Sequence, residues 1–222
     1  MKTALITGAS SEMGLSIAKS LEGRYRLILV VNTNDLGYKF SNAEIIKCDF
    51  NNEDSVNEFI NRIKEKYNKI DLIINVAARS IDYNVDEIEK KEFLDVLNVN
   101  TIIPFILIKD LLNKKGGVAI NISSTDGVDT YNEYNLMYAT SKAALNHLTK
   151  QLSYIYKDAY IYALILNYVN TKTTKSMNQL FLNSELKRIK QIKLIDISEI
   201  CNEINRLLAI KPKSGTMVRM DG

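Results

Sequence analysis

Short runs of aliphatic and β-branched residues alternate with longer amphipathic stretches along the whole chain. This alternation is typical of successive βα units, which build a parallel sheet with helices on both faces. Runs such as Leu27–Val31 and Leu72–Ile74 are apolar without a polar face, as expected of strands covered on both sides. The pattern predicts strands near residues 3–7, 26–31, 44–48, 71–75, 117–122, 160–166 and 216–220. It predicts helices near residues 12–22, 53–67, 87–96, 101–114, 135–157 and 196–209.

The length and composition fit one large α/β domain. The chain has 222 residues, of which 46% are hydrophobic, and it contains no repeat or flexible linker. We therefore expect a single doubly wound, Rossmann-like domain over residues 1–222. Residues 172–193 are the least regular and mix polar residues with Met177, Leu180 and Phe181. We expect this segment to form a substrate flap with one amphipathic helix; the alternative is an ordinary surface connection.

Charge and cysteine content favour small soluble partners. The 29 basic and 26 acidic residues are spread along the chain, so no basic surface for nucleic acid or membrane is predicted. Cys48 and Cys201 lack the spacing of a disulfide framework or a metal site, so we predict no metal and expect both thiols to be packed.

The apolar run Thr3–Ile6 meets a glycine too soon for a signal peptide, and no run approaches the ~20 residues of a membrane span. We expect a cytoplasmic protein.

A turn that contains two glycines joins the first predicted strand to the first predicted helix. Thr7–Gly14 has the position of a loop whose N–H groups and following helix N-terminus face a phosphate. The alternative is a tight turn without a ligand. Glu12 lies in the middle of the turn, where a negative charge opposes a phosphate if it points inward. The turn residues predicted to contact a dinucleotide are Gly8, Ser10, Ser11, Glu12, Met13 and Gly14.

Further candidate cofactor contacts follow the next strands. Asp49 and Phe50 follow the third strand, where the Asp49 carboxylate is suited to an adenine amino group, and Asn75 and Ala77 end the fourth strand. The alternatives are capping of the strand end for Asp49 and a hydrogen bond across the sheet for Asn75. Asn32 ends the second strand, where a carboxylate would bind a free ribose 2′-hydroxyl, so the site favours NADP slightly over NAD. No arginine near Asn32 is evident to hold a 2′-phosphate.

A second group of residues suits proton transfer. Tyr138 and Lys142 are four residues apart in a predicted helix, so they project from one face, and an ammonium group favours the phenolate of a neighbouring tyrosine. Ser124 ends a predicted strand and so places a hydroxyl at the carboxyl edge of the sheet. Asn100 begins a predicted helix, where its amide is suited to holding a water in a proton relay.

The order and spacing of these motifs resemble the short-chain dehydrogenase/reductase family, and within it the 3-oxoacyl-carrier-protein reductases. The resemblance implies that Tyr138 is the general acid/base, that Ser124 holds the substrate oxygen, that Lys142 binds the nicotinamide ribose and lowers the tyrosine pKa, and that Asn100 supports the relay. Ser123 is a poorer candidate than Ser124 for holding the substrate oxygen, and Asn98 is a poorer candidate than Asn100 for supporting the relay. The likeness rests on Thr7–Gly14, Asp49, Asn75–Ala78, Asn100, Ile122–Ser124, Tyr138, Lys142, Thr171 and Gly215–Gly222.

The resemblance also implies a cofactor, a substrate class and an assembly. Thr171 would contact the nicotinamide carboxamide, with backbone groups of Val169 beside it, and the cofactor would be NADP or NAD. The substrate would be a small carbonyl compound or alcohol, and an anionic carrier-linked or sugar-nucleotide form fits the lysines of the flap. A homodimer or homotetramer is implied, with the lone His147 in a packing or interface role.

Three departures from the family pattern bear on function. Glu12 replaces the middle glycine of the phosphate loop, Val76–Ala78 replaces Asn-Ala-Gly, and Leu166–Asn167 replaces Pro-Gly. Asparagine tolerates positive φ, so the last change is mild. Two hypotheses follow: an NAD(P)-dependent oxidoreductase that uses Tyr138, or a catalytically weakened dinucleotide sensor or scaffold on the same fold.

Overall fold

The computed structural model describes residues 1–222 and contains one seven-stranded sheet. All strand pairs are parallel and the spatial order is β3-β2-β1-β4-β5-β6-β7. The strands are β1 (Thr3–Thr7), β2 (Arg26–Val31), β3 (Ala43–Lys47), β4 (Leu72–Asn75), β5 (Val118–Ser124), β6 (Tyr160–Leu166) and β7 (Met217–Met220). The predicted doubly wound, Rossmann-like α/β fold is confirmed, and the strand positions agree with the sequence pattern within a few residues.

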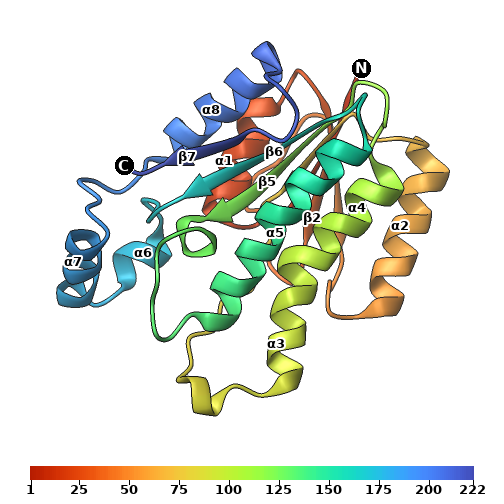
Figure 1. Cartoon of the computed structure of the whole chain (residues 1–222). Coiled ribbons are helices and arrows are strands. Elements are labelled where there is room, and N and C mark those ends of the chain that lie inside the picture. The colour runs from red at the N-terminus through yellow and green to blue at the C-terminus, as the bar shows by residue number, and fades with distance from the viewer.

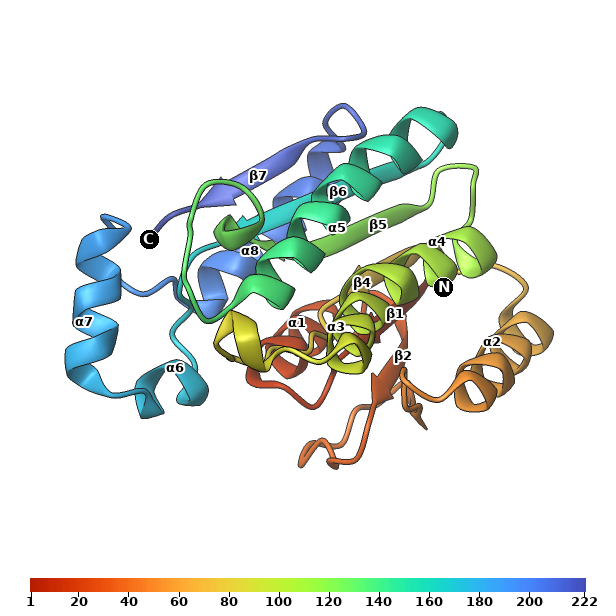
Figure 2. The same cartoon turned by 60° about the horizontal axis from the view of Figure 1, so that its bottom comes forward.

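Helices cover both faces of the sheet, with α1 and α8 on one face and α2, α4 and α5 on the other (Figures 1 and 2). The helices are α1 (Glu12–Leu21), α2 (Glu53–Tyr67), α3 (Lys90–Leu97), α4 (Ile103–Leu111), α5 (Leu136–Ile155), α6 (Lys172–Ser176), α7 (Gln179–Arg188) and α8 (Ile197–Ile210). None of them is long and apolar enough to cross a membrane.

The sheet separates two hydrophobic cores. Successive side chains of a strand point to opposite faces. In β1, Ala4 and Ile6 pack in the core beneath α1 and α8, while Leu5 packs in the core beneath α2, α4 and α5. Each strand in the middle of the sheet must therefore be apolar on both faces, which is why the sequence shows continuous aliphatic runs rather than alternation.

The strand order reverses between β1 and β4. The chain passes from β1 outward through β2 to β3 and then returns to pair β4 with the other side of β1. Open sheets of this kind leave a crevice at the carboxyl ends of the strands where the direction changes. In register, Thr7 at the end of β1 lies beside Asn75 at the end of β4, and Asn75 lies beside Asn121 of β5.

Two helical regions differ from the sequence prediction. The helix predicted over residues 101–114 is preceded by a π turn, Asn98–Ile102, before α4 begins. Asn98 and Asn100 donate side-chain hydrogen bonds to backbone oxygens of distant segments, and a widened turn accommodates these contacts. The predicted flap holds two helices, α6 and α7, instead of one. Both lie near the carboxyl ends of β5 and β6 (Figure 1).

Candidate active site

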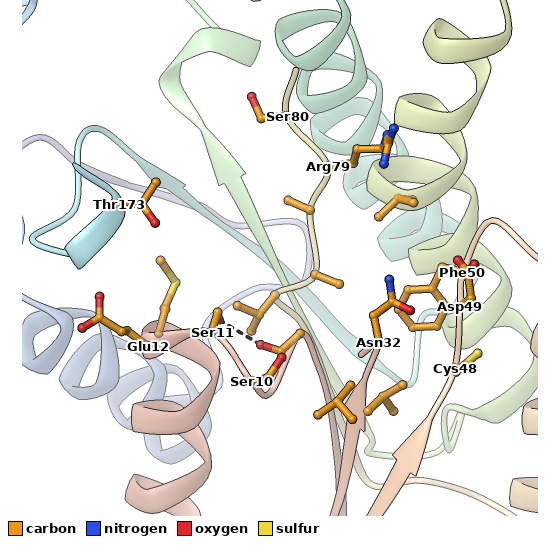
Figure 3. A pocket seen from close by; sticks show the side chains of 18 of the residues that line it. Ser10, Ser11, Glu12, Asn32, Cys48, Asp49, Phe50, Arg79, Ser80 and Thr173 are labelled. Atoms are coloured by element: carbon orange, nitrogen blue, oxygen red, sulfur yellow. Dashed lines mark hydrogen bonds between the residues drawn. The ribbon is translucent and has the colours of Figure 1, made fainter. Parts of the chain in front are cut away.

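A cavity of about 930 Å³ opens at the reversal crevice (Figure 3). It lies between the first turn of α1, the carboxyl ends of β1 to β4, and the start of α6. Most of the residues predicted to contact a dinucleotide line it, namely Gly8, Ser10, Ser11, Glu12, Met13, Asn32, Asp49, Phe50, Ala77 and Thr171.

The loop after β1 is fixed by the N-terminal cap of α1. The Ser11 hydroxyl accepts a hydrogen bond from Gly14 N at 3.0 Å and donates one to Gly8 O at 2.8 Å. A Cβ on Gly14 would lie 2.3 Å from Gly8 O, so a side chain there would force the loop away from the helix. The N–H groups of Glu12 and Met13, in the first turn of α1, have no acceptor within the helix. Together with the helix dipole they suit a bound phosphate.

Glu12 points away from the centre of the cavity (Figure 3). Its Oε2 accepts a hydrogen bond from the backbone N–H of Lys172, the first residue of α6. The sequence left open whether the Glu12 side chain points to solvent or into the cavity. In the structure it bridges the phosphate loop and the flap. We call this contact between Glu12 and Lys172 the clasp. The carboxylate is thereby held out of the space beside the free N–H groups.

Asn32, Asp49, Phe50 and Arg79 lie together on the opposite side of the cavity (Figure 3). The Asp49 carboxylate accepts a hydrogen bond from Asn51 N at 2.9 Å, so it caps the strand end and faces the cavity as well. The cavity also contains an arginine that the sequence analysis did not anticipate. Arg79 is distant in the sequence, but it follows β4 and reaches the same wall because β4 and β2 flank β1. Arg79 follows Ala77 and Ala78 directly, and this position after a predicted cofactor contact was the sequence signal that could have identified it.

Some predicted cofactor residues lie outside the cavity lining. The Asn75 amide donates a hydrogen bond to Asn121 Oδ1 at 2.8 Å within the sheet, which is the alternative stated for it. Gly14 closes the loop behind the cavity. Val169 is buried, and its carbonyl accepts a hydrogen bond from Thr171 N at 2.8 Å. Thr171 itself caps α6 and does line the cavity.

Tyr138, Lys142 and Ser124 meet at the carboxyl edge of the sheet. Lys142 Nζ lies 5.4 Å from the centre of the Tyr138 ring and donates a hydrogen bond to Ile122 O at 2.8 Å. The Ser124 side chain lies close enough to the Tyr138 hydroxyl to lower the pKa of the tyrosine. The neighbouring Ser123 instead points toward the backbone oxygen of Lys142, at 3.5 Å. Ser124 is therefore the serine that faces the tyrosine.

The electrostatics of this group differ from the prediction. Burial raises the pKa of Tyr138 above its ordinary value, and the Asp126 carboxylate raises it further, while the nearby Ser124 side chain opposes both. Burial also lowers the pKa of Lys142 to about 8. The expected lowering of the tyrosine pKa by Lys142 is therefore absent from this structure. Its ammonium proton is directed at the Ile122 carbonyl rather than at the phenol.

Asn100 is fully buried in the π turn, and both of its amide hydrogens are used. Nδ2 donates to Arg79 O and to Ser141 Oγ, each at 2.9 Å, and Oδ1 accepts from Arg79 N at 2.8 Å. The side chain thus ties the segment after β4 to α5, directly behind Tyr138. No amide hydrogen is left for a water, so a relay at Asn100 would have to use carbonyl groups of the widened turn.

The residues given a packing role behave in different ways. Cys48 and Cys201 are buried, and burial raises the pKa of both thiols, which makes them unreactive. His147 is exposed on α5 and contacts Gln151 at 3.2 Å. Packing inside the chain is therefore excluded for His147, and an interface role stays a prediction.

The cavity fits a nicotinamide dinucleotide. It has free N–H groups at a helix N-terminus for a pyrophosphate, and the amide of Asn32 and the guanidinium of Arg79 line it as well. Thr171, at the start of α6, lines another part of the cavity. The volume of the cavity lies within the range of cofactor sites.

Comparison with known proteins agrees with this geometry. A family model described as short chain dehydrogenase matches residues 2–180. The chain is 32% identical over 163 residues to a 3-oxoacyl-[acyl-carrier-protein] reductase of Rickettsia typhi, covering 69% of this chain and 66% of that protein. It is 27% identical over 168 residues to a 3β-hydroxysteroid dehydrogenase of Mediterraneibacter gnavus, covering 70% of this chain and 60% of that protein. The match to the reductase of Buchnera aphidicola, at 26% identity, spans 100% of this chain and 96% of the relative.

Solved structures share the whole fold. A 4-hydroxyisoleucine dehydrogenase complexed with NADH superimposes with a TM-score of 0.90 at 23% identity, covering 100% of this chain and 98% of that one. A short chain dehydrogenase from Burkholderia cenocepacia in complex with NADP gives 0.87 at 19% identity, with 100% and 96% covered. The family match covers most of the chain and includes the phosphate loop, Ser124, Tyr138 and Lys142. The chain belongs to the short-chain dehydrogenase family, whose members are NAD(P)-dependent oxidoreductases.

Proposed function

We propose that this protein reduces a carbonyl compound, or oxidises the corresponding alcohol, with Tyr138 as the general acid/base. The observation that carries the proposal is the meeting of Tyr138, Ser124 and Lys142 at the sheet edge beside the dinucleotide cavity. When bound, the nicotinamide supplies or takes up the hydride. Tyr138 donates the proton to the substrate oxygen in the reductive direction and removes it in the oxidative direction.

The other residues hold and polarise the substrate. Ser124 donates a hydrogen bond to the substrate oxygen and so stabilises the negative charge that develops there. Lys142 would hold the ribose next to the nicotinamide through the ammonium group that here donates a hydrogen bond to Ile122 O. An ammonium group that also faced the tyrosine would supply the electrostatic support for phenolate that the present arrangement lacks.

The cofactor favoured in this proposal is NADP, with NAD as the alternative. Asn32 has no carboxylate to repel a 2′-phosphate, and Arg79 lies on the same wall with a charge suited to that phosphate. Substrates include small or carrier-linked carbonyl compounds. Leu180 and Phe181 of the flap are exposed on α7 and do not line the dinucleotide cavity. The clasp holds Glu12 away from the phosphate site, so the sensor or scaffold alternative has no structural observation in its favour.

The test is oxidation of NADPH or NADH in the presence of a carbonyl panel. Tyr138→Phe removes one hydroxyl and keeps the ring, so it should lower kcat by at least ~100-fold, within the range of general acid catalysis, and leave dinucleotide affinity within about threefold. Tyr154→Phe, an exposed tyrosine on the same helix, is the matched control and should be unchanged. Equal turnover by wild type and Tyr138→Phe would overturn the mechanism.

A further inference from the structure

Asp126 is an acidic residue at the substrate end of the site for which neither the fold nor the proposed mechanism accounts. It lies in the short turn Thr125–Gly127 that follows β5, two residues after Ser124. The Ser124 hydroxyl donates a hydrogen bond to Asp126 Oδ2 at 3.1 Å, and Asp126 N donates one to Ser124 Oγ at 3.2 Å. The carboxylate takes part in none of the ten ion pairs of the molecule.

The turn holds this carboxylate in place. A Cβ on Gly127 would lie 2.5 Å from the carbonyl carbon of Lys142 and 2.6 Å from Ala143 N, so the turn is in direct contact with the backbone of α5. Asn146 reinforces the contact by donating a side-chain hydrogen bond to Gly127 O at 3.2 Å. Asp126 is therefore fixed beside Ser124 and Tyr138 by the helix that carries the tyrosine.

The groups around Asp126 leave an excess of hydrogen-bond acceptors. The Asn135 side chain, at the start of α5, lies close enough to lower the pKa of Asp126, and Asn135 Oδ1 is buried and has no partner. Arg188 of α7 faces the same region, but its guanidinium is bound to both oxygens of Glu185, at 2.9 and 2.6 Å. Tyr168, after β6, lies beside the same Glu185 and lowers the pKa of its carboxyl group. Thus no free cation faces Asp126 from β5, α5, the segment after β6, or α7.

The spacing of Ser124 and Asp126 matches a substrate with two adjacent polar groups. In the proposed reaction Ser124 Oγ holds the reacting oxygen. Two oxygens, or an oxygen and a nitrogen, that are bonded to neighbouring carbons lie about one hydrogen-bond length apart. Ser124 Oγ and Asp126 Oδ2 have the same separation. We propose that Asp126, with Asn135 Oδ1, accepts hydrogen bonds from a hydroxyl or ammonium group on the carbon next to the reacting carbon. This inference rests on the proposed function and defines its substrate class.

The substrate class is therefore α-hydroxy or α-amino carbonyl compounds, together with the corresponding vicinal diols or amino alcohols. Such a donor satisfies Asn135 Oδ1 and the free lone pairs of Asp126. A 2-oxo acid places a carboxylate against Asp126, and the repulsion of like charges selects against it. A simple ketone leaves both acceptors without a partner, and a site built for a hydroxyl discriminates strongly against an analogue without one.

Four methyl ketones of one three-carbon framework test the proposal: hydroxyacetone, aminoacetone, acetone and pyruvate. In wild type, kcat/KM for hydroxyacetone or aminoacetone should exceed that for acetone by about 100-fold, and pyruvate should be no better than acetone. The two donor-bearing compounds distinguish a hydroxyl from an ammonium group. In Asp126→Asn the ratio of kcat/KM for hydroxyacetone to kcat/KM for acetone should fall at least tenfold, chiefly through the KM for hydroxyacetone.

Matched variants separate recognition from folding. Asp129→Asn replaces a nearby exposed acid that pairs with Arg219 and should leave the preference unchanged. Asn135→Ala removes the second acceptor and should lower the same ratio of kcat/KM values by weakening hydroxyacetone binding. The thermal midpoint of each variant is recorded, and Asn135→Ala decides the outcome if Asp126→Asn is unstable. Equal kcat/KM for hydroxyacetone and acetone in wild type, or a preference unchanged in both site variants, overturns the inference.

A binding measurement distinguishes failure of this inference from failure of the proposed function. Propane-1,2-diol, 1-aminopropan-2-ol and propan-2-ol are titrated by calorimetry into the protein saturated with NADP⁺. Tighter binding of the diol or amino alcohol than of propan-2-ol, lost in Asp126→Asn, supports the subsite even if no ketone is turned over. Turnover of ketones without any such difference leaves the proposed function intact and overturns the subsite.

Discussion

At the scale of single residues, the buried Lys142 has an energetic cost in the absence of the dinucleotide. Its side chain is almost fully buried, and its ammonium has one hydrogen bond, to Ile122 O, in the protein as described. Burial lowers its pKa to about 8, whereas an unfolded lysine titrates near ~10.4. Below about pH 8 Lys142 is charged in both the folded and the unfolded protein. The charge is less favourable in the folded protein because the side chain is buried there. The free energy of unfolding is therefore reduced in this pH range, and it recovers as pH rises toward about 10.4.

Lys142→Met should therefore stabilise the unliganded protein at pH 7. The gain is on the order of 1–2 kcal/mol, because release from the burial cost exceeds the lost hydrogen bond, and it raises Tm by about 2–6 °C. The gain should shrink as pH rises from 8 to above 10, while activity is lost at every pH. Thermal melts at several pH values measure this. Lys150→Met, at an exposed position on the same helix, is the control, and a Tm for Lys142→Met at or below wild type at pH 7 would contradict the prediction.

The positions of the candidate catalytic residues were predictable because local rules place them. Four residues along a helix put Lys142 on the face of Tyr138, and the end of a buried strand puts Ser124 at the sheet edge. Arg79 and Asp126 were missed because irregular segments, whose course no periodicity describes, carry them to the site. The tyrosine pKa was also predicted wrongly, since its direction depends on burial and on Asp126 rather than on the Tyr138–Lys142 spacing.

At the scale of elements, a buried carboxylate makes one of the contacts that attach the flap to the rest of the molecule. Glu185 of α7 is buried, and it accepts hydrogen bonds from Arg188 on its own helix and from Asn132 in the segment before α5, the latter at 3.3 Å. Leu182 is the other buried residue of α7. The sequence predicted a flap but placed one helix in it, because Met177 and Asn178 between α6 and α7 give no strong break in composition.

Glu185→Ala should loosen the flap and leave the rest of the protein folded. Loss of charge-assisted bonds of about 1–2 kcal/mol should raise the rate of tryptic cleavage within residues 172–193 about tenfold, with Tm changed by no more than a few degrees. Cleavage sites are identified by mass spectrometry. Glu203→Ala breaks an arginine pair of the same geometry on α8, with Arg206, and should have no such effect. Unchanged cleavage in Glu185→Ala would show that α7 is held by other contacts.

At the scale of the whole molecule, α4 and α5 lie side by side on one outer face in both views (Figures 1 and 2). Apolar residues of this face are exposed, including Tyr154 at 75%, Ile155 at 59% and, in the preceding π turn, Ile102 at 46%. The family resemblance implies a homodimer or homotetramer, and we predict that an interface on this face covers these exposed residues.

We expect light scattering to give a mass of two or four times the 25.2 kDa of the chain. Tyr154→Glu places a charge on the α4–α5 face and should shift the protein toward the monomer. Ile210→Glu makes the same kind of change at a 63% exposed residue of α8 and should keep the wild-type mass. A monomeric wild type, or an assembly that tolerates Tyr154→Glu and is lost in Ile210→Glu, would place the interface elsewhere.

The clasp joins residues 160 positions apart and connects the two halves of the site. A dinucleotide that altered the phosphate loop would therefore also change the free energy with which α6, the first helix of the flap, is held in place. If the flap contacts the substrate, the resulting coupling is reciprocal: the factor by which the dinucleotide changes the affinity for substrate equals the factor by which the substrate changes the affinity for dinucleotide. Under the proposed function, one carboxylate, that of Glu12, would thus couple the binding of the two ligands.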